Sequence, residues 1–223
     1  MTSLARRLVL YFVFLAVVPL YAGFLGFTAV IERSEQNRVD AGLQASLRAT
    51  LATYENELLN AQNNAERLAR TSAFKQAVAR RHRTVLAAFV TDSPGLRVVI
   101  GSLRLGKAYP YAGERRVQFV GVKKSVGELV TSVPLNSAYL RRLETLAGVA
   151  SSEKVMLARG NHVLGAKSGA GARAKLNRNG IGRVQLGGED YRILVSHPVT
   201  ARGSVGFALV TPEARVVNAV SHL

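Results

Sequence analysis

The segment Leu8–Ile31 contains 24 residues and not one charged side chain. As an α-helix with a rise of about 1.5 Å per residue it would be roughly 36 Å long, enough to cross the ~30 Å hydrocarbon core of a bilayer. Pro19 lies in its middle, where it would break a helix in water, but transmembrane helices tolerate proline better. The sequence therefore predicts a transmembrane helix over residues 8–31 after a short tail, residues 1–7.

The charges that flank this segment predict its orientation. Arg6 and Arg7 precede it, whereas Glu32 and Glu35 follow it. The positive-inside rule then places the tail in the cytoplasm and the main domain outside the inner or plasma membrane. A cleaved signal peptide is the alternative, but the apolar run is long for one, and the best cleavage site, after Ala22, has the bulky Leu20 where a small residue is preferred. Either way the remaining residues leave the cytosol.

The chain is basic and has no cysteine. It has 30 Lys and Arg against 14 Asp and Glu, a net charge of +16, and residues 154–188 carry seven basic side chains and no acidic one. Such a surface attracts anionic headgroups, anionic wall polymers or a small anionic ligand. The predicted topology argues against nucleic acid as the partner. A simpler interpretation is an ordinary solvated surface of an arginine-rich protein.

An apolar stripe of helical period follows the predicted anchor. From Leu47 onward its members alternate three and four residues apart, as in a heptad repeat, and no proline lies between Pro19 and Pro94. This predicts a long stalk helix over 32–70 that pairs with a second copy to form a homodimer. The alternative is that the stripe packs on its own domain, and the two could divide its length. Its members are Val39, Leu43, Leu47, Leu51, Tyr54, Leu58, Ala61, Ala65 and Leu68.

Residues 71–212 are predicted to form an α+β domain on an antiparallel sheet. Thr71 or Ser72 caps a short helix, a second helical piece covers 85–90, and Asp92–Gly95 reads as a turn. Strands are expected at 96–100, 117–122, 128–133, 154–158, 162–164, 183–186, 191–196 and 204–211, with a helix at 137–146 and a glycine-rich loop at 165–182. Helices segregated from tightly connected strands are typical of this class. A terminal helix over 213–223 would lead towards a second membrane span.

No catalytic or metal-binding motif is complete. Ser151–Lys154 matches S-x-x-K without its companion motifs. The glycine-rich residues 160–174 only partly match phosphate and dinucleotide fingerprints, because no helix is predicted after them. The four histidines are scattered. We therefore expect no enzyme activity, no cofactor and no metal site in this segment.

The layout nevertheless resembles the extracytoplasmic Cache-type, PAS-like sensor domains of bacterial transmembrane receptors. The resemblance lies in the arginine-flanked anchor with Val18-Pro-Leu20 and in the long helix over 34–70. It continues with Leu68–Phe74, Asp92–Val99 and Leu129–Leu140, a strand that runs into a helix, and with the closing strands Tyr191–Ser196 and Val205–Val210. It covers nearly the whole chain by order and spacing, without a ligand-binding motif that transfers.

The resemblance implies a ligand-sensing region whose output module, such as a diguanylate cyclase, histidine kinase or chemoreceptor domain, belongs to a longer protein. A ligand in the sheet's pocket would shift the terminal helices, and the basic segment favours an anion. We expect Tyr109, Tyr111, Arg116 and Tyr191 to line that pocket. Two alternatives stay open: a bitopic assembly protein of a pilus or secretion machine, and a membrane-anchored binder of anionic wall polymer.

Overall fold

The computed structural model describes residues 3–120, 126–165, 171–200 and 205–213. The predicted terminal helix over 213–223 therefore lies outside the described residues, apart from Glu213. The helices are α1 (Ser3–Arg70), α2 (Ser72–Ala79), α3 (Arg83–Asp92) and α4 (Ser137–Leu146). The strands are β1 (Leu96–Ile100), β2 (Leu103–Leu105), β3 (Ala112–Val120), β4 (Val126–Pro134), β5 (Lys154–Arg159), β6 (His162–Leu164), β7 (Ala172–Arg173), β8 (Lys175–Leu176), β9 (Ile181–Leu186), β10 (Glu189–Pro198) and β11 (Gly206–Pro212).

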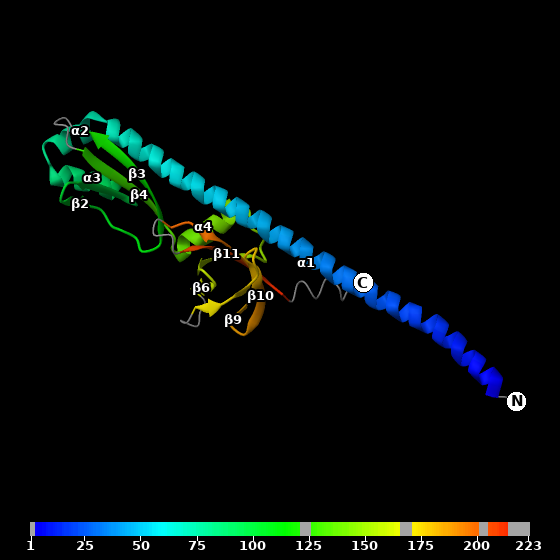
Figure 1. The fold of residues 1–223 in the computed structure, drawn as a ribbon. Helices are drawn as coiled ribbons and strands as arrows, with labels where there is room; N and C mark the ends of the chain where they lie inside the picture. Colours follow the sequence, from blue (N-terminus) through cyan, green and yellow to red (C-terminus); the bar gives the residue numbers. More distant parts are fainter. Residues whose placement is uncertain (1–2, 121–125, 166–170, 201–204, 214–223) are drawn as a thin grey trace.

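Helix α1 is the longest described element and contacts both sheets of the protein. It is continuous for 68 residues, with Pro19 inside it, and its N-terminal part extends far beyond the rest of the protein (Figure 1). Among the described residues, no helix carries a stretch that is both apolar and long enough to span a membrane. From Leu43 onward the predicted apolar stripe faces the protein's own core, because Leu43, Leu47, Tyr54, Leu58 and Ala65 are no more than 7% exposed. Packing on its own domain, the alternative interpretation of this stripe, is thus confirmed for that part.

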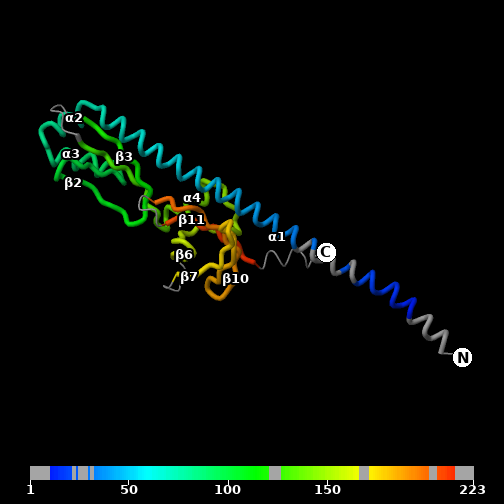
Figure 2. Tube along the Cα trace, viewed as in Figure 1, coloured from blue at the N-terminus to red at the C-terminus, as the bar shows by residue number. Residues whose placement is uncertain are grey.

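The strands form two antiparallel sheets in the described part of the chain, where the sequence predicted one. The first has the order β2-β1-β4-β3 and the second β7-β6-β5-β11-β10-β9-β8. We call the first sheet with α2 and α3 the distal module, because it lies at the Arg70 end of α1. The second sheet with α4 is the proximal module and lies midway along α1 (Figures 1 and 2). The single predicted sheet is corrected in this respect.

The distal module buries one face of its sheet. Alternate residues of β1 are buried, and with Leu129 of β4 and Phe119 of β3 they form a core beneath the three helices. Phe74 of α2 lies at its centre, edge-to-face with Phe89 and Phe119 at centroid distances of 5.8 and 5.2 Å. Of the two predicted caps, Thr71 is the one that caps α2, because its hydroxyl accepts a hydrogen bond from the Phe74 amide. The helix side of this sheet is therefore filled by aliphatic side chains around a central group of three phenylalanines.

The proximal module places β11 in the middle of its sheet, between β5 and β10. Every residue of β11 from Gly206 to Thr211 is buried, since α1 covers one face of the strand and a second apolar cluster lies on the other. The buried members of this cluster are Ala158, Val163, Ala174, Val184, Ile193, Ala208 and Val210. Helix α4 begins at Ser137, as predicted, where the Asn136 side chain accepts a hydrogen bond of 2.8 Å from the Tyr139 amide. It packs between α1 and β5.

Ion pairs fasten α1 to both modules. Asp40 binds Arg192 of β10 through both carboxylate oxygens, at 2.5 and 2.7 Å. Glu55 pairs with Arg115 of β3, and Glu57 with Arg142 of α4 at 3.1 Å. One rigid helix therefore connects the two sheets.

Two strand predictions require correction. Strand β3 begins at Ala112, not Val117, because it pairs in continuous register with β4 despite the weak strand propensity of Gly113 and Glu114. The predicted loop at 165–182 contains the two-residue strands β7 and β8 and the start of β9. Such short strands are stabilised by pairing with β6 and β9 and leave no periodic signal in the sequence.

Candidate functional site

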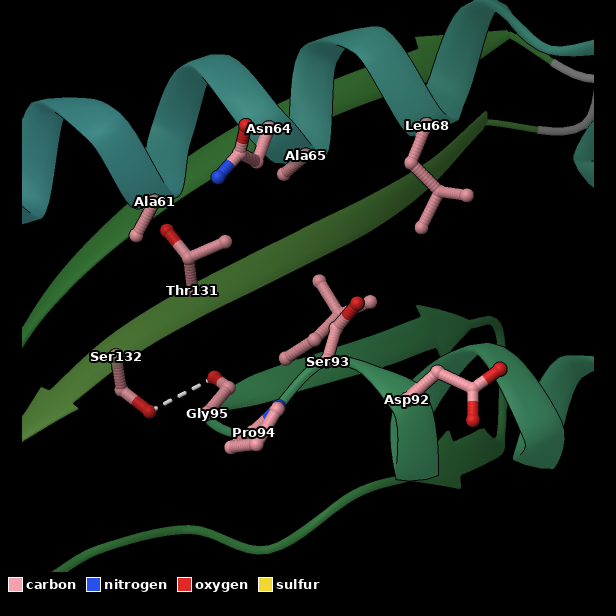
Figure 3. Close-up of a pocket in the computed structure, with 11 residues that line it drawn as sticks. Ala61, Asn64, Ala65, Leu68, Asp92, Ser93, Pro94, Gly95, Thr131 and Ser132 are labelled. Carbon is pink, nitrogen blue, oxygen red and sulfur yellow. Dashed lines mark hydrogen bonds between the residues drawn. The ribbon is translucent and has the colours of Figure 1, made fainter.

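A cavity of about 300 Å³ lies in the distal module, between α1, the turn after α3 and strand β4. Figure 3 shows that its walls come from segments far apart in the sequence: α1 above, β4 across the middle and the turn below. We call it the distal cavity. Its lining residues are Ala61, Asn64, Ala65, Leu68, Asp92, Ser93, Pro94, Gly95, Leu96, Thr131 and Ser132.

Local backbone chemistry shapes its lower wall. Gly95 adopts φ +88°, and a Cβ atom there would lie only 2.2 Å from the carbonyl oxygen of Ser132, so glycine is required. The Ser132 hydroxyl and amide both donate to the Gly95 carbonyl oxygen, each at 2.9 Å. These bonds fix the Asp92–Gly95 turn, which the sequence predicted, against β4. On the opposite wall the small side chains of Ala61 and Ala65 leave the space open.

The lining of the distal cavity is mixed in polarity. Thr131, which is 4% exposed, and Asn64 approach from opposite walls, and Ser93 adds a further hydroxyl (Figure 3). Asp92, at the end of α3, is the one charged side chain among the lining residues. Leu68 and Leu96 supply apolar surface. A small pocket with several hydrogen-bonding groups, apolar patches and one carboxylate suits a small polar molecule that carries a positive group.

A larger hollow of about 800 Å³ lies in the proximal module, between α4 and β5. We call it the proximal cleft. Its surface is mainly apolar, with charged side chains from Arg141, Glu144 and Lys154. The Glu144 carboxylate accepts a hydrogen bond of 2.7 Å from the Val155 amide, which joins α4 to β5. The other lining residues are Tyr111, Leu135, Ser137, Leu140, Val155, Met156, Leu157, Leu164 and Gly165.

The structure does not bring the four residues expected to bind ligand into one of these hollows. Tyr111 lines the proximal cleft, where the Arg159 guanidinium lies 5.9 Å from its ring centroid. Tyr109 is half-buried in the connection between β2 and β3, with the Lys107 ammonium 5.8 Å from its ring. Arg116 is exposed on β3 and pairs with Glu128 at 3.6 Å.

Tyr191 lies on β10, where its ring packs on the second apolar cluster of the proximal sheet. Its hydroxyl donates to Glu189 at 2.9 Å, and this hydrogen bond raises the pKa of the Tyr191 phenol. Within the described residues, no cluster of three or more His, Cys, Asp or Glu side chains could hold a metal ion.

Two ligand-binding domains of known structure have a similar architecture. The ligand-binding domain of Mlp24 with asparagine superposes with a TM-score of 0.52 and 11% sequence identity, over 86% of this chain and 99% of that domain. The ligand-binding domain of the Pseudomonas aeruginosa PAO1 amino acid chemoreceptor PctB, in complex with L-Arg, gives a TM-score of 0.50 and 10% identity, over 84% and 91%. The fold is that of a Cache-type sensor domain. The expected resemblance is thereby confirmed at the level of the fold.

Sequence comparisons contribute nothing further: no protein-family model and no curated protein matches this chain. At about one residue in ten identical, only the Cache-type fold is shared, so the ligand must be argued from the cavities themselves.

Sequence reasoning missed most of the distal cavity. The sequence pattern places Ala61 and Ala65 in the packing stripe of α1. It contains no signal that Asn64 and Ser132 would line a cavity. The Asp92–Gly95 turn was predicted, yet nothing local indicated that it would face α1. A cavity is made by small side chains whose neighbours lie on distant segments, and that signal is absent from a single sequence.

Proposed function

We propose that this chain is the extracytoplasmic ligand-sensing region of a membrane-anchored signalling receptor, and that the distal cavity binds a small ligand with an amino group. The observation that carries the proposal is a cavity of mixed polarity, with one carboxylate, between the long helix and the distal sheet of a Cache-type fold. Mlp24 and PctB have asparagine and L-Arg bound to domains of this fold. Free amino acids and related amines are therefore the ligands to test first.

The chemistry of the lining supports this choice. A ligand ammonium would pair with the Asp92 carboxylate and donate to hydroxyl or amide oxygens such as those of Thr131 and Asn64. Leu68 and Leu96 would contact a short apolar side chain. The sequence favoured an anion because of the basic segment over residues 154–188, but that segment does not line this cavity, whose only ionisable lining residue is acidic. Local charge outweighs the charge of the whole protein at such short distances.

The predicted anchor completes the proposal. Large apolar side chains of α1 from Tyr11 to Tyr21, together with Phe24 and Val30, are exposed beyond both modules, for example Phe12 at 72% and Leu15 at 77%. Contact between so much apolar surface and water is unfavourable. A lipid bilayer around residues 8–31 would remove that surface from water. A second copy alongside the N-terminal part of α1, which extends beyond both modules, would make the expected homodimer (Figure 1).

The test is ligand binding by the full chain, purified in detergent and screened against the twenty amino acids and simple amines by thermal shift and calorimetry. A ligand of the native state at a hundred times its Kd stabilises by about 2.7 kcal/mol, which raises Tm by several degrees. We expect at least one amine-bearing ligand to bind. Asp92→Asn should weaken its binding about tenfold, and Ala61→Leu should obstruct the cavity.

Asp190→Asn is the matched control, because Asp190 is an exposed acid at the start of β10, outside the cavity. Equal affinity in Asp92→Asn and Asp190→Asn would remove the distal cavity from consideration. A screen in which no amine binds would contradict the proposed ligand class and favour the wall-polymer alternative.

A further inference from the structure

The proximal cleft has the features of a second binding site, with chemistry opposite to that of the distal cavity. Its floor is made of Leu135 and of Val155 and Leu157 from β5, all buried. Leu140 and Leu164 stand at the sides, each half-buried. This continuous apolar lining in a hollow of about 800 Å³ suits a ligand body without polar groups.

The polar groups of the cleft come from one face of α4. Ser137, Leu140, Arg141 and Glu144 are spaced three and four residues apart, so all four project from the same side of the helix. Arg142, which follows Arg141 in the sequence, lies on another face of α4 and pairs with Glu57 of α1 at 3.1 Å. Arg141 forms no ion pair with another described residue, and its side chain is exposed.

Further cations lie at the two ends of β5. Lys154 lines the cleft where the strand begins, beside Glu144. At the other end Arg159 lies against the ring of Tyr111, with its Nη2 atom 3.5 Å from the phenol oxygen. The Glu144 carboxylate is the one acidic group in the lining, and it is engaged by the Val155 amide. The lining of the cleft thus combines an apolar floor with Arg141 and with the hydroxyl groups of Tyr111 and Ser137, and Arg159 lies beside the ring of Tyr111.

We propose that the proximal cleft binds an amphipathic carboxylate, such as a medium-chain fatty acid. Its chain lies on the leucine and valine floor, and its head group meets Arg141, Arg159 and the Tyr111 hydroxyl. Carboxylates match the planar donor fork of arginine, and the apolar floor excludes small, fully hydrated anions such as phosphate. This inference is independent of the amine ligand proposed for the distal cavity.

The experiment is calorimetric titration of the full chain with sodium octanoate, in nanodiscs of a zwitterionic lipid so that no detergent competes for the cleft, and the heat measured with empty nanodiscs is subtracted. Acetate, which lacks the chain, and octylammonium, which reverses the charge, are the comparison ligands. We expect saturable binding of octanoate and a Kd at least about tenfold weaker for the other two. Arg141→Gln and Arg159→Gln should each weaken octanoate binding about fivefold or more, and Arg142→Gln should leave it unchanged.

Ser137→Phe, which places a ring in the mouth of the cleft, is a second variant that does not depend on charge and should also weaken octanoate binding. The proposal is overturned if octanoate fails to bind, if octylammonium binds as tightly, or if Arg142→Gln weakens binding as much as Arg141→Gln. Amino acid binding at the distal cavity should be unaffected by Ser137→Phe. The proposals for the two sites can therefore be tested independently of each other.

Discussion

The phenol oxygen of Tyr54 lies 2.6 Å from the amide nitrogen of Gly113, which donates a hydrogen bond to it. The same hydroxyl donates to the Val133 carbonyl oxygen at 3.0 Å. One buried side chain of α1 thus joins β3 and β4 of the distal sheet. Its ring also meets Phe207 of β11 edge-to-face, at a centroid distance of 5.2 Å. Tyr54 is where the helix, the distal sheet and the proximal sheet come together.

Gly113→Ala should destabilise the protein. A Cβ atom at this position would lie 2.6 Å from the Tyr54 oxygen and 2.8 Å from a Leu58 methyl carbon, so the junction must shift. Overpacking of this kind costs about 1–3 kcal/mol. Gly42→Ala is the control, since the nearest atom to its Cβ would be Glu153 Oε1 at 3.8 Å. It should stabilise α1 by up to ~1 kcal/mol, and urea unfolding should show the two opposite signs.

Tyr54→Phe should also destabilise, by about 1–3 kcal/mol, because the buried Gly113 amide and Val133 carbonyl both lose their partner. The combination with Gly113→Ala is more informative. Removing the hydroxyl relieves part of the clash with the new methyl group, so the double variant should lose less stability than the sum of the two single variants. Strict additivity in a double-mutant cycle would mean that the two residues do not interact.

Stability should fall above pH 10, in part through Tyr139. Burial raises the pKa of the Tyr139 phenol from 10.0 to about 12, and burial raises the pKa of Tyr54 as well. The unfolded chain releases these protons near pH 10 while the folded state retains them, so the stabilisation is complete below pH 10 and is lost between pH 10 and 12. Urea unfolding at pH 8, 10 and 11 should show this loss.

Tyr139→Phe should make that alkaline loss shallower. At pH 7 the substitution should be neutral or stabilising, because the Tyr139 hydroxyl is buried without a hydrogen-bond partner among the described residues. A clear loss of stability at pH 7 would indicate that the hydroxyl has a partner, such as a bound water.

Asp40→Asn tests how firmly α1 is held to the proximal sheet. Arg192 and Asp40 are only 15% and 18% exposed, so neutralising the aspartate leaves a charge that water solvates poorly. We expect a loss of about 1–3 kcal/mol. Glu66→Gln on the same helix is the comparison: its pair with Arg70 spans 4.0 Å, with Arg70 82% exposed, and should change stability by less than ~0.5 kcal/mol.

Local patterns predicted much of the fold. Strand β1 and helix α4 were found over the predicted residues, because their β-branched runs, caps and turns act within a few residues. The apolar stripe of α1 was also found, but its partner was ambiguous, since a heptad pattern serves a second helix and a sheet equally well. The division into two sheets was missed. It depends on β11 pairing with β5, about fifty residues earlier, and alternation within a strand does not specify its neighbour.

The candidate sites were harder to predict than the fold. Of the four expected residues, Tyr111 lines a hollow together with a basic lysine from the 154–188 segment. Tyr191 instead packs in an apolar cluster, and Arg116 pairs with Glu128, its diagonal neighbour on β4. Aromatic and basic residue types indicate that a side chain can bind something, but only the pairing of strands decides which side chains converge.

The central position of β11 has a consequence for biogenesis. The strands on either side of it, β5 and β10, have no direct hydrogen bonds to each other, so the proximal sheet stays in two halves until residues 206–212 have left the ribosome or the translocon. The distal sheet needs nothing beyond residue 134 and can close earlier. Until β11 is synthesised, the part of the α1 stripe around Leu43 and Leu47 would therefore stay exposed to solvent. A chaperone would be needed most during this interval.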